Sequence, residues 1–118
     1  MKTDVGEAWH PIEEGATIGR PGSEDGITIR DDEHPLGARI TLEEKCRHCP
    51  FTITCGIYGW MCHTRFLGDL ETAEKNYHEM KNELVAILLQ IPFTIDPESE
   101  RKSNEVCEKI AEFVARFP

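Results

Sequence analysis

The chain has 118 residues and a formal net charge of -9 at pH 7, a combination that excludes several classes of protein. A chain of this length buries enough surface for one domain, residues 1–118, to fold without a structural metal or a disulfide. The acidic balance argues against nucleic-acid binding, because a polyphosphate backbone is bound through clustered Lys and Arg side chains.

Residues 1–25 are predicted to form an irregular N-terminal arm. Glycine and proline recur throughout this range, and its apolar residues follow neither the period of a strand nor that of a helix. One short strand is expected around residues 16–18, and Trp9 is expected to anchor the arm to the rest of the domain.

Residues 26–67 are predicted to form an antiparallel β-meander of three or four strands. Apolar and polar residues alternate over residues 27–30 and again over residues 38–43, and the turn sequence DDEHPLG separates the two runs. Residues 51–66 include many β-branched and aromatic side chains and no proline. We therefore predict that they form one long central strand.

A hairpin loop over residues 45–50 gives the second and third strands a consistent register. It places Glu44 opposite Phe51 and aligns apolar residues on one face of the sheet. The aligned pairs are Leu42 with Ile53, Ile40 with Cys55, and Ala38 with Ile57. The other face pairs Thr41 with Thr54 and is polar, so Cys55 is expected to be a small core residue.

Residues 69–117 are predicted to form two amphipathic helices. Apolar residues recur at steps of three and four from Leu70 to Ile91, with Asp69 as the N-cap and Pro92 after the end. The second helix is expected to begin at Asp96 and Pro97. It is expected to bury Val106, Ile110, Phe113 and Phe117. With both helices on one face of the meander, the predicted fold is a two-layer α+β domain.

Four of the five cysteines lie in the segment CRHCPFTITCGIYGWMCH, residues 46–63. A zinc ion needs ligand atoms within about 2.0 to 2.3 Å. An extended strand instead spaces its residues by about 3.3 Å each. We therefore expect the cysteines of a straight strand to be spread along it and not to share one zinc ion.

The first part of this segment, Cys46, His48 and Cys49, is expected in the hairpin loop. A C-x-x-C pair supplies half of a zinc site. The string C-x-H-C also resembles the active-site string of thiol oxidoreductases of the thioredoxin superfamily, in which the first cysteine begins a helix. A β-branched run follows the string here, so we do not infer that activity. Three interpretations stay open: inert thiols, a metal site completed by another chain, and a redox site.

A second group of candidate ligands is expected at the open end of the hairpin. The same register brings His34 close to Cys62 and His63, with Asp31 and Asp32 as neighbours. Imidazole, thiolate and carboxylate groups bind zinc or perform acid–base chemistry near neutral pH. The alternative is a solvated turn whose histidine makes ordinary hydrogen bonds.

Three aromatic residues, Tyr58, Trp60 and Phe66, are expected on the sheet face opposite Ile53 and Ile57. If the helices cover the Ile face, these aromatics need another cover, because large exposed apolar patches mark interaction sites. The N-terminal arm is one candidate cover. The other, which we favour, is a second copy in a twofold homodimer.

These observations suggest a cytoplasmic protein and a non-catalytic role. The first residues are charged, and the longest apolar run, residues 84–89, is far shorter than the roughly 20 residues of a membrane span. We therefore expect neither a signal peptide nor a membrane partner. The expected function is that of an acidic interaction or regulatory module, with a basic protein as a candidate partner. The alternative is a metal-binding protein or small metal-dependent enzyme.

Overall fold

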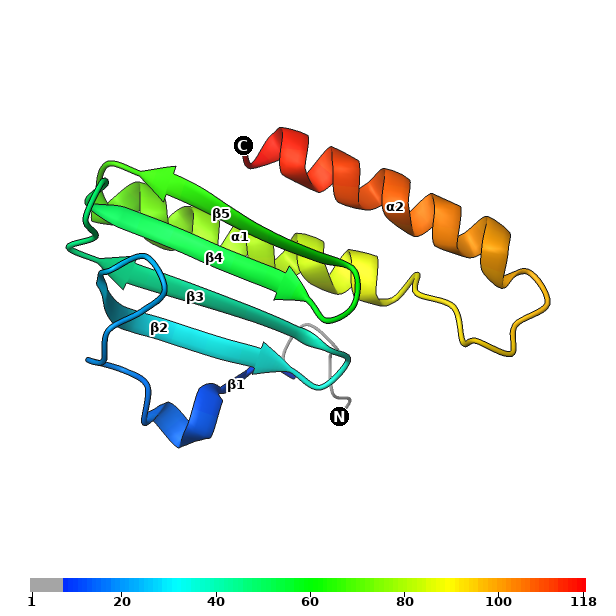
Figure 1. The fold of residues 1–118 in the computed structure, drawn as a ribbon, viewed down its shortest axis with the longest axis horizontal. Helices are drawn as coiled ribbons and strands as arrows, with labels where there is room; N and C mark the ends of the chain where they lie inside the picture. Colours follow the sequence, from blue (N-terminus) through cyan, green and yellow to red (C-terminus); the bar gives the residue numbers. More distant parts are fainter. Residues whose placement is uncertain (1–7) are drawn as a thin grey trace.

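The structure, a computed structural model, describes residues 8–118 and confirms the two-layer α+β fold (Figure 1). One antiparallel sheet with the strand order β1-β2-β3-β4-β5 forms the first layer, and two helices form the second. The sheet has one more strand than the upper limit of the prediction. The elements are β1 (His10–Pro11), a 3₁₀ helix η2 (Ile12–Gly15), β2 (Ile27–His34), β3 (Ala38–Glu44), β4 (Phe51–Ile57), β5 (Met61–Leu67), α1 (Leu70–Leu88) and α2 (Ser99–Arg116).

The prediction of a single long strand over residues 51–66 is wrong, because the chain reverses at Tyr58–Trp60. The Trp60 amide donates a hydrogen bond to the Ile57 carbonyl at 2.8 Å, and Gly59 has φ of 83°. Glycine adopts this left-handed conformation without a steric penalty. The turn contains three residues, so Ile57 and Met61 face each other. Odd-numbered residues therefore point to the same face before and after the turn. For this reason the apolar and polar pattern of residues 51–66 looks like that of one uninterrupted strand.

The register predicted for the β3–β4 hairpin is confirmed. Glu44 lies opposite Phe51, Ile40 opposite Cys55 and Ala38 opposite Ile57. Cys55 is 2% exposed, as expected for a core residue. The period of two leaves this register few alternatives, because a slip of one residue would move every apolar side chain of a strand to the other face.

α1 packs against the face of the sheet that carries Ile40 and Cys55, which we call the helix face, and α2 lies against α1 and alongside β5 (Figure 1). Asp69 caps α1, because its carboxylate accepts a hydrogen bond from the Thr72 amide at 2.8 Å. α1 ends at Leu88, one turn earlier than predicted, and α2 begins at Ser99. The helices contribute buried side chains that include Ala73, Tyr77, Met80, Leu84, Val106 and Phe113, and Phe117, directly after α2, adds another. No helix among the described residues is long and apolar enough to cross a membrane.

In the described part of the N-terminal arm, residues 8–25, the strand lies at another place than predicted. Residues 16–18 lie in a turn, and the strand is β1, which pairs with the end of β2. Trp9 anchors the arm as expected: its ring meets the His34 ring edge-on at 5.1 Å and lies 5.2 Å from the Lys81 ammonium group. Further along the arm, Pro21 forms an isolated antiparallel β-bridge with Ile27 at the start of β2.

Candidate functional site

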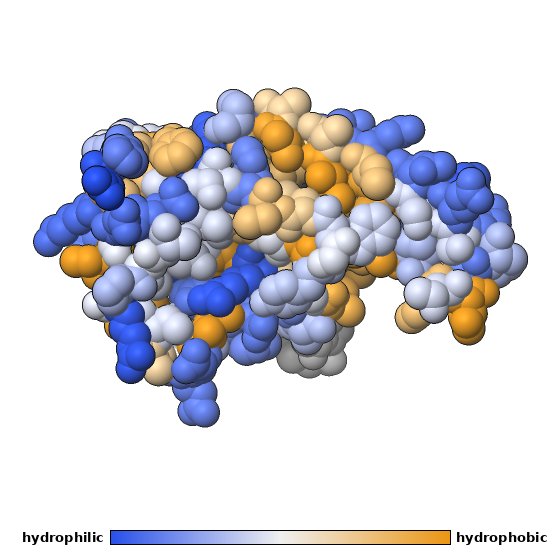
Figure 2. Space-filling view, in the orientation of Figure 1, coloured by the Kyte–Doolittle hydropathy of each residue, from blue (hydrophilic) through white to orange (hydrophobic). Residues whose placement is uncertain are grey.

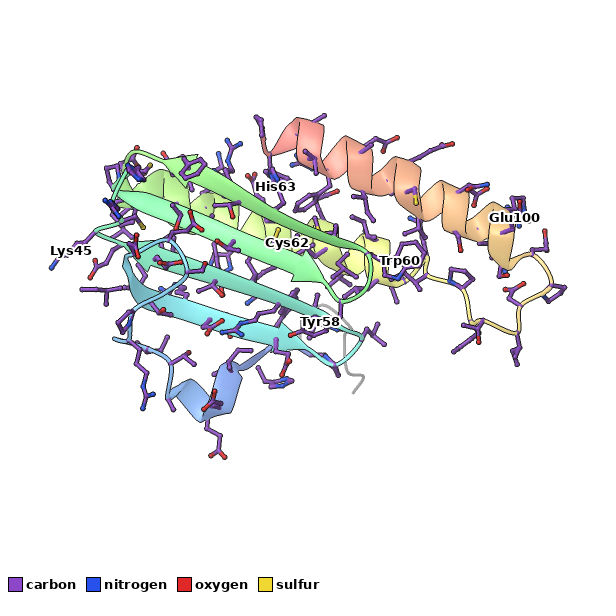
Figure 3. All side chains as sticks on the ribbon, viewed as in Figure 1. Lys45, Tyr58, Trp60, Cys62, His63 and Glu100 are labelled. Atoms are coloured by element: carbon purple, nitrogen blue, oxygen red, sulfur yellow. The ribbon has the colours of Figure 1, made fainter. Side chains whose placement is uncertain are left out.

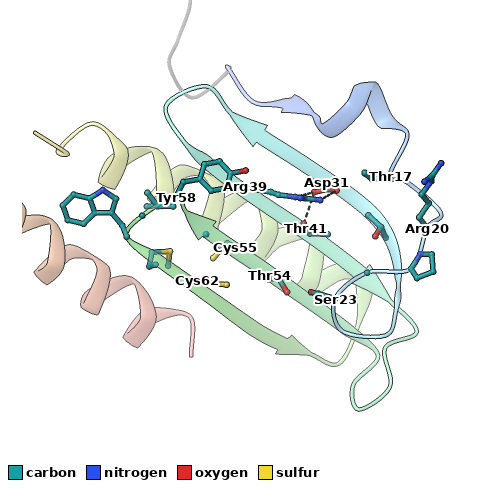
Figure 4. Close-up of a pocket in the computed structure, with 18 residues that line it drawn as sticks. Thr17, Arg20, Ser23, Asp31, Arg39, Thr41, Thr54, Cys55, Tyr58 and Cys62 are labelled. Atoms are coloured by element: carbon teal, nitrogen blue, oxygen red, sulfur yellow. Dashed lines mark hydrogen bonds and ion pairs between the residues drawn. The ribbon is translucent and has the colours of Figure 1, made fainter. Parts of the chain in front are cut away.

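The sheet face opposite the helices, which we call the open face, carries a groove of about 800 Å³ (Figure 4). The arm at residues 17–23 borders one end of the groove, and the turn at residues 58–60 borders the other. The strands between them supply the floor. This volume lies in the range of about 300 to 1,000 Å³ that is typical of small-molecule sites.

The floor of the groove is polar and has a low point at Gly56. Thr41 and Thr54 lie opposite each other on β3 and β4 and both line the groove. Two residues further along β4, Gly56 lies opposite Arg39 on one side and opposite Cys62 of β5 on the other. Because glycine has no side chain, the backbone is accessible there, as at other sites where a ligand approaches a strand closely.

Arg39 is held in the groove by Asp31. Its Nε and Nη2 atoms donate to the two carboxylate oxygens at 3.0 and 2.7 Å, and Thr41 donates to the same carboxylate at 2.9 Å. The Asp31 side chain is 2% exposed, whereas that of Arg39 is 45% exposed. The hydrogen bond to Asp31 raises the pKa of Arg39, so the guanidinium stays charged. Asp31 therefore fixes the orientation of a cation that remains accessible from the groove.

The lining of the groove is positive although the chain as a whole is acidic. Of the described residues that line it, Asp31 carries the only carboxylate, and Arg20 and Arg39 are the two bases. Asp31 is already paired with Arg39. The lining residues thus carry one net positive charge, which favours an anion over a cation, and Glu33, opposite Arg39 on β2, lies just outside the lining.

A buried carboxylate, Glu43, fixes the arm that borders the groove. Glu43 is 0% exposed, and its side chain accepts hydrogen bonds from the Glu24 amide at 3.2 Å and the Gly26 amide at 3.1 Å. A Cβ atom placed on Gly22 would come within 2.2 Å of the Glu43 carboxyl carbon. Glycine at position 22 therefore lets the arm lie directly against the Glu43 carboxylate.

The other end of the groove is more apolar. Tyr58, Trp60 and Met61 line it. The Tyr58 hydroxyl donates to Glu33 at 3.1 Å. Burial is the main cause that raises the pKa of Tyr58, and the bond to Glu33 acts in the same direction, so the hydroxyl stays protonated. The groove therefore joins a cationic centre to an aromatic end.

The structure does not bring together His34, Cys62 and His63, the first predicted metal site. His34 is on β2 and its ring contacts Trp9, whereas the two other residues are on β5. Cys62 and His63 are neighbours in a strand and point to opposite faces. His63 contacts Phe113 and the Phe117 carbonyl on the helix face (Figure 3). Within residues 8–118, no group of three or more His, Cys, Asp or Glu side chains could hold a metal ion.

The second predicted set, Cys46, His48 and Cys49, lies in the β3–β4 loop as expected, and its thiols have separate partners. The Cys46 sulfur lies 3.4 Å from the Thr52 hydroxyl. The Cys49 thiol donates to the Phe51 and Leu67 carbonyls at 3.3 and 3.0 Å, and His48 is exposed. Burial raises the pKa of Cys46, whereas the reactive cysteine of a redox pair has a lowered pKa.

The three aromatics predicted as an interface do not form one patch. Tyr58 is at the β4–β5 turn and is 57% exposed. Trp60, in the same turn, is half-buried and packs against the core (Figure 3). Phe66 is 58% exposed on the open face, but it lies at the other end of β5, opposite Thr52. The self-association that we predicted from these residues stays a prediction.

Sequence reasoning missed Arg39 and Asp31, which form the centre of the groove. Arg39 was recognised only as a polar residue of a strand, and Asp31 only as a neighbour of the predicted His34, Cys62 and His63 site. The signal that points to them is Gly56, a glycine in the middle of a strand, because the confirmed register places Arg39 beside it.

The chain matches no protein-family model, and it shows no significant similarity to any curated protein or to any solved structure.

Proposed function

We propose that the protein is a non-catalytic binding module, and that its open-face groove holds a small organic acid with an apolar body. The observation that carries this proposal is the pair formed by Asp31 and Arg39. Arg39 is fixed by a buried partner, yet 45% of its side chain remains exposed. A preorganised guanidinium loses less entropy when it binds a carboxylate than a mobile side chain does.

The remaining donors of Arg39 suit a carboxylate. A guanidinium has five N–H groups. Asp31 accepts bonds from Nε and Nη2, so both N–H groups of Nη1 and one of Nη2 remain for a ligand. Two of them lie side by side on one edge and can form the parallel pair of hydrogen bonds typical of arginine–carboxylate recognition.

The apolar body of the ligand would extend along the floor toward Tyr58 and Met61. These residues line the end of the groove beyond Arg39 (Figure 4). We infer binding rather than catalysis because the carboxylate that lines the groove, Asp31, is engaged by both Arg39 and Thr41. A general base needs a free acceptor within reach of the substrate proton.

Isothermal titration calorimetry with a panel of monocarboxylates, from butyrate to octanoate and indole-3-acetate, tests this proposal. 1-Octanol serves as the neutral probe. The informative variant is the double substitution Asp31→Asn with Arg39→Gln, which removes the cation and leaves no unpaired charge in the floor. We expect its affinity for the acids to fall about tenfold to 100-fold, the range of a hydrogen bond to a charged group.

The matched control is Arg101→Gln, which removes the same charge from an exposed position on α2. It is expected to bind like the unsubstituted protein. The proposal fails if none of the acids binds, if 1-octanol binds as tightly as octanoate, or if the double variant retains full affinity.

A further inference from the structure

β5 forms one edge of the sheet and has a strand neighbour on one side only. The opposite edge is β1, which has two residues and contains Pro11. β5 has seven residues, MCHTRFL, and no proline. A strand of this length at an edge offers its outer N–H and C=O groups as a template for another strand.

The register identifies which backbone groups of β5 point outward. Tyr58 donates its backbone N–H to Gly37, at the end of β3. Successive residues of a central antiparallel strand bond alternately to its two neighbours. The even-numbered residues of β4 therefore bond to β3, and the odd-numbered residues bond to β5. Their partners on β5 are Leu67, Arg65, His63 and Met61.

It follows that Cys62, Thr64 and Phe66 direct their backbone N–H and C=O groups away from the sheet. They alternate with the residues that bond to β4. Among the described residues, no strand lies on that side of β5. On the open face, the side chains of Cys62 and Phe66 are exposed.

α2 lies alongside the outer edge of β5 in the view of Figure 1. It meets β5 from the helix face, through the contacts of Phe113 with His63. Cys107, Ala111 and Val114 on α2 are exposed and spaced four and three residues apart, so they form one apolar stripe. Figure 2, seen from the open face, shows apolar side chains gathered over β5 and the adjoining part of α2.

We propose that a second copy of this chain docks here, with its β5 antiparallel to the first and centred on Thr64. The two sheets then become one continuous sheet. Cys62 lies opposite the partner's Phe66, and Thr64 lies opposite the partner's Thr64. The outward groups pair in this register, and each hydrogen-bonded pair of an antiparallel ladder exchanges two bonds.

Two observations favour a second copy over another chain. First, the register is self-complementary: the seven residues of β5 are centred on Thr64, and each exposed thiol meets an aromatic ring, a favourable contact for sulfur. Second, residues 45–68 contain no carboxylate in a chain with 22 acidic residues. Along the paired strands, two acidic molecules would therefore meet without opposed carboxylates, and the carboxylates of α2, Glu105, Glu108 and Glu112, lie outside the strand pairing.

The dimer would also contribute a residue to the groove. Cys62 lines the groove, so the partner's Phe66 would stand at its wall. The docking does not depend on the ligand proposed above, because it uses the backbone of β5 and not Arg39.

Sedimentation velocity of the full chain over a range of concentrations tests the docking. We expect a concentration-dependent species of twice the 13.4 kDa chain mass. Thr64→Pro is the informative variant, because proline removes an outward N–H and is tolerated on an edge strand. It also removes the Thr64 hydroxyl, which lies 3.3 Å from the Thr54 hydroxyl, and Thr64→Ala removes that group as well. Thr64→Pro should be monomeric where the unsubstituted protein is dimeric. Thr64→Ala keeps the N–H and should remain dimeric.

A cross-link tests the register. In a chain with Cys62→Ser and Cys107→Ser, Thr64→Cys should form a covalent dimer under mild oxidation, because directly opposed residues lie within disulfide range. Arg65→Cys, whose side chain is on the helix face, should not. A monomer at every concentration, a dimer that survives Thr64→Pro, or a dimer that Thr64→Cys does not cross-link would each overturn the proposal. Circular dichroism checks that every variant is folded.

Discussion

Asp31 and Arg39 form a bidentate ion pair diagonally across β2 and β3. Asp31 lies opposite Thr41, and Arg39 lies opposite Glu33, so the two are not direct cross-strand neighbours. The arginine side chain spans this diagonal and ends 2.7 Å from the carboxylate. The pair places a charged group in the middle of the open face, where the rest of the floor is built from threonine and glycine.

Removing the cation alone is expected to destabilise the fold. Arg39→Met leaves the Asp31 carboxylate, which is 2% exposed, with Thr41 as its remaining side-chain donor. We predict a loss of about 1 to 3 kcal/mol in the free energy of unfolding, measured by urea denaturation. The double variant Asp31→Asn with Arg39→Gln should be more stable than Arg39→Met, because it leaves no unpaired charge. Equal stability of Arg39→Met and the unsubstituted protein would contradict the role assigned to the pair.

The arm over the groove is expected to open when Glu43 is removed. Glu43→Ala leaves the Glu24 and Gly26 amides without their acceptor. Cleavage by endoproteinase Glu-C after Glu24 should become about tenfold faster or more, because each orphaned buried donor costs about 1 to 3 kcal/mol. The control is Glu44→Ala, at the next position and on the other face. Similar cleavage rates for the two variants would argue against the anchor.

A methyl group at Gly22 is expected to disturb the same anchor. The added Cβ would lie 2.2 Å from the Glu43 carboxyl carbon, so the carboxylate would have to move away from the Glu24 and Gly26 amides that it accepts hydrogen bonds from. We predict that Gly22→Ala lowers the melting temperature. At Gly68 a Cβ would meet nothing within 4 Å, so Gly68→Ala should leave the melting temperature nearly unchanged. If the order were reversed, the arm would not be packed as described.

The thiols are expected to react in two classes. Cys62 and Cys107 are exposed. Burial raises the pKa of Cys55 to about 12, so its reactive thiolate is scarce at mildly alkaline pH. Mass spectrometry after iodoacetamide treatment should show alkylation of Cys62 and Cys107 first, and of Cys55 only after unfolding in urea. Early labelling of Cys55 in the native protein would contradict its place in the core.

Much of the fold could be predicted because the hydrophobic pattern constrains it strongly. One loop assignment, residues 45–50, placed both Ile40 and Cys55 on a buried face, and the structure has that register. In the same way, Asp69 as the N-cap and the apolar residues at steps of three and four after it correctly predicted where α1 begins. In each case one face of the element is buried, so local pattern and tertiary structure agree.

The turn at Gly59 could not be recognised by the same means. A glycine between two β-rich runs is compatible with both a strand and a turn, and the three-residue turn preserves the alternation of faces. The groove was missed for another reason. Which part of the open face stays uncovered depends on where the arm crosses it, and this crossing depends on the contact of Gly22 with Glu43, which are far apart in the sequence.

The most direct test of the binding proposal is a ¹⁵N-edited NMR titration of the unsubstituted protein with octanoate. The proposal predicts saturable shifts in the amides of Thr41, Thr54 and Gly56 on the groove floor, with little change in α1 and α2. Shifts confined to the helices, or no shifts at any octanoate concentration, would contradict it.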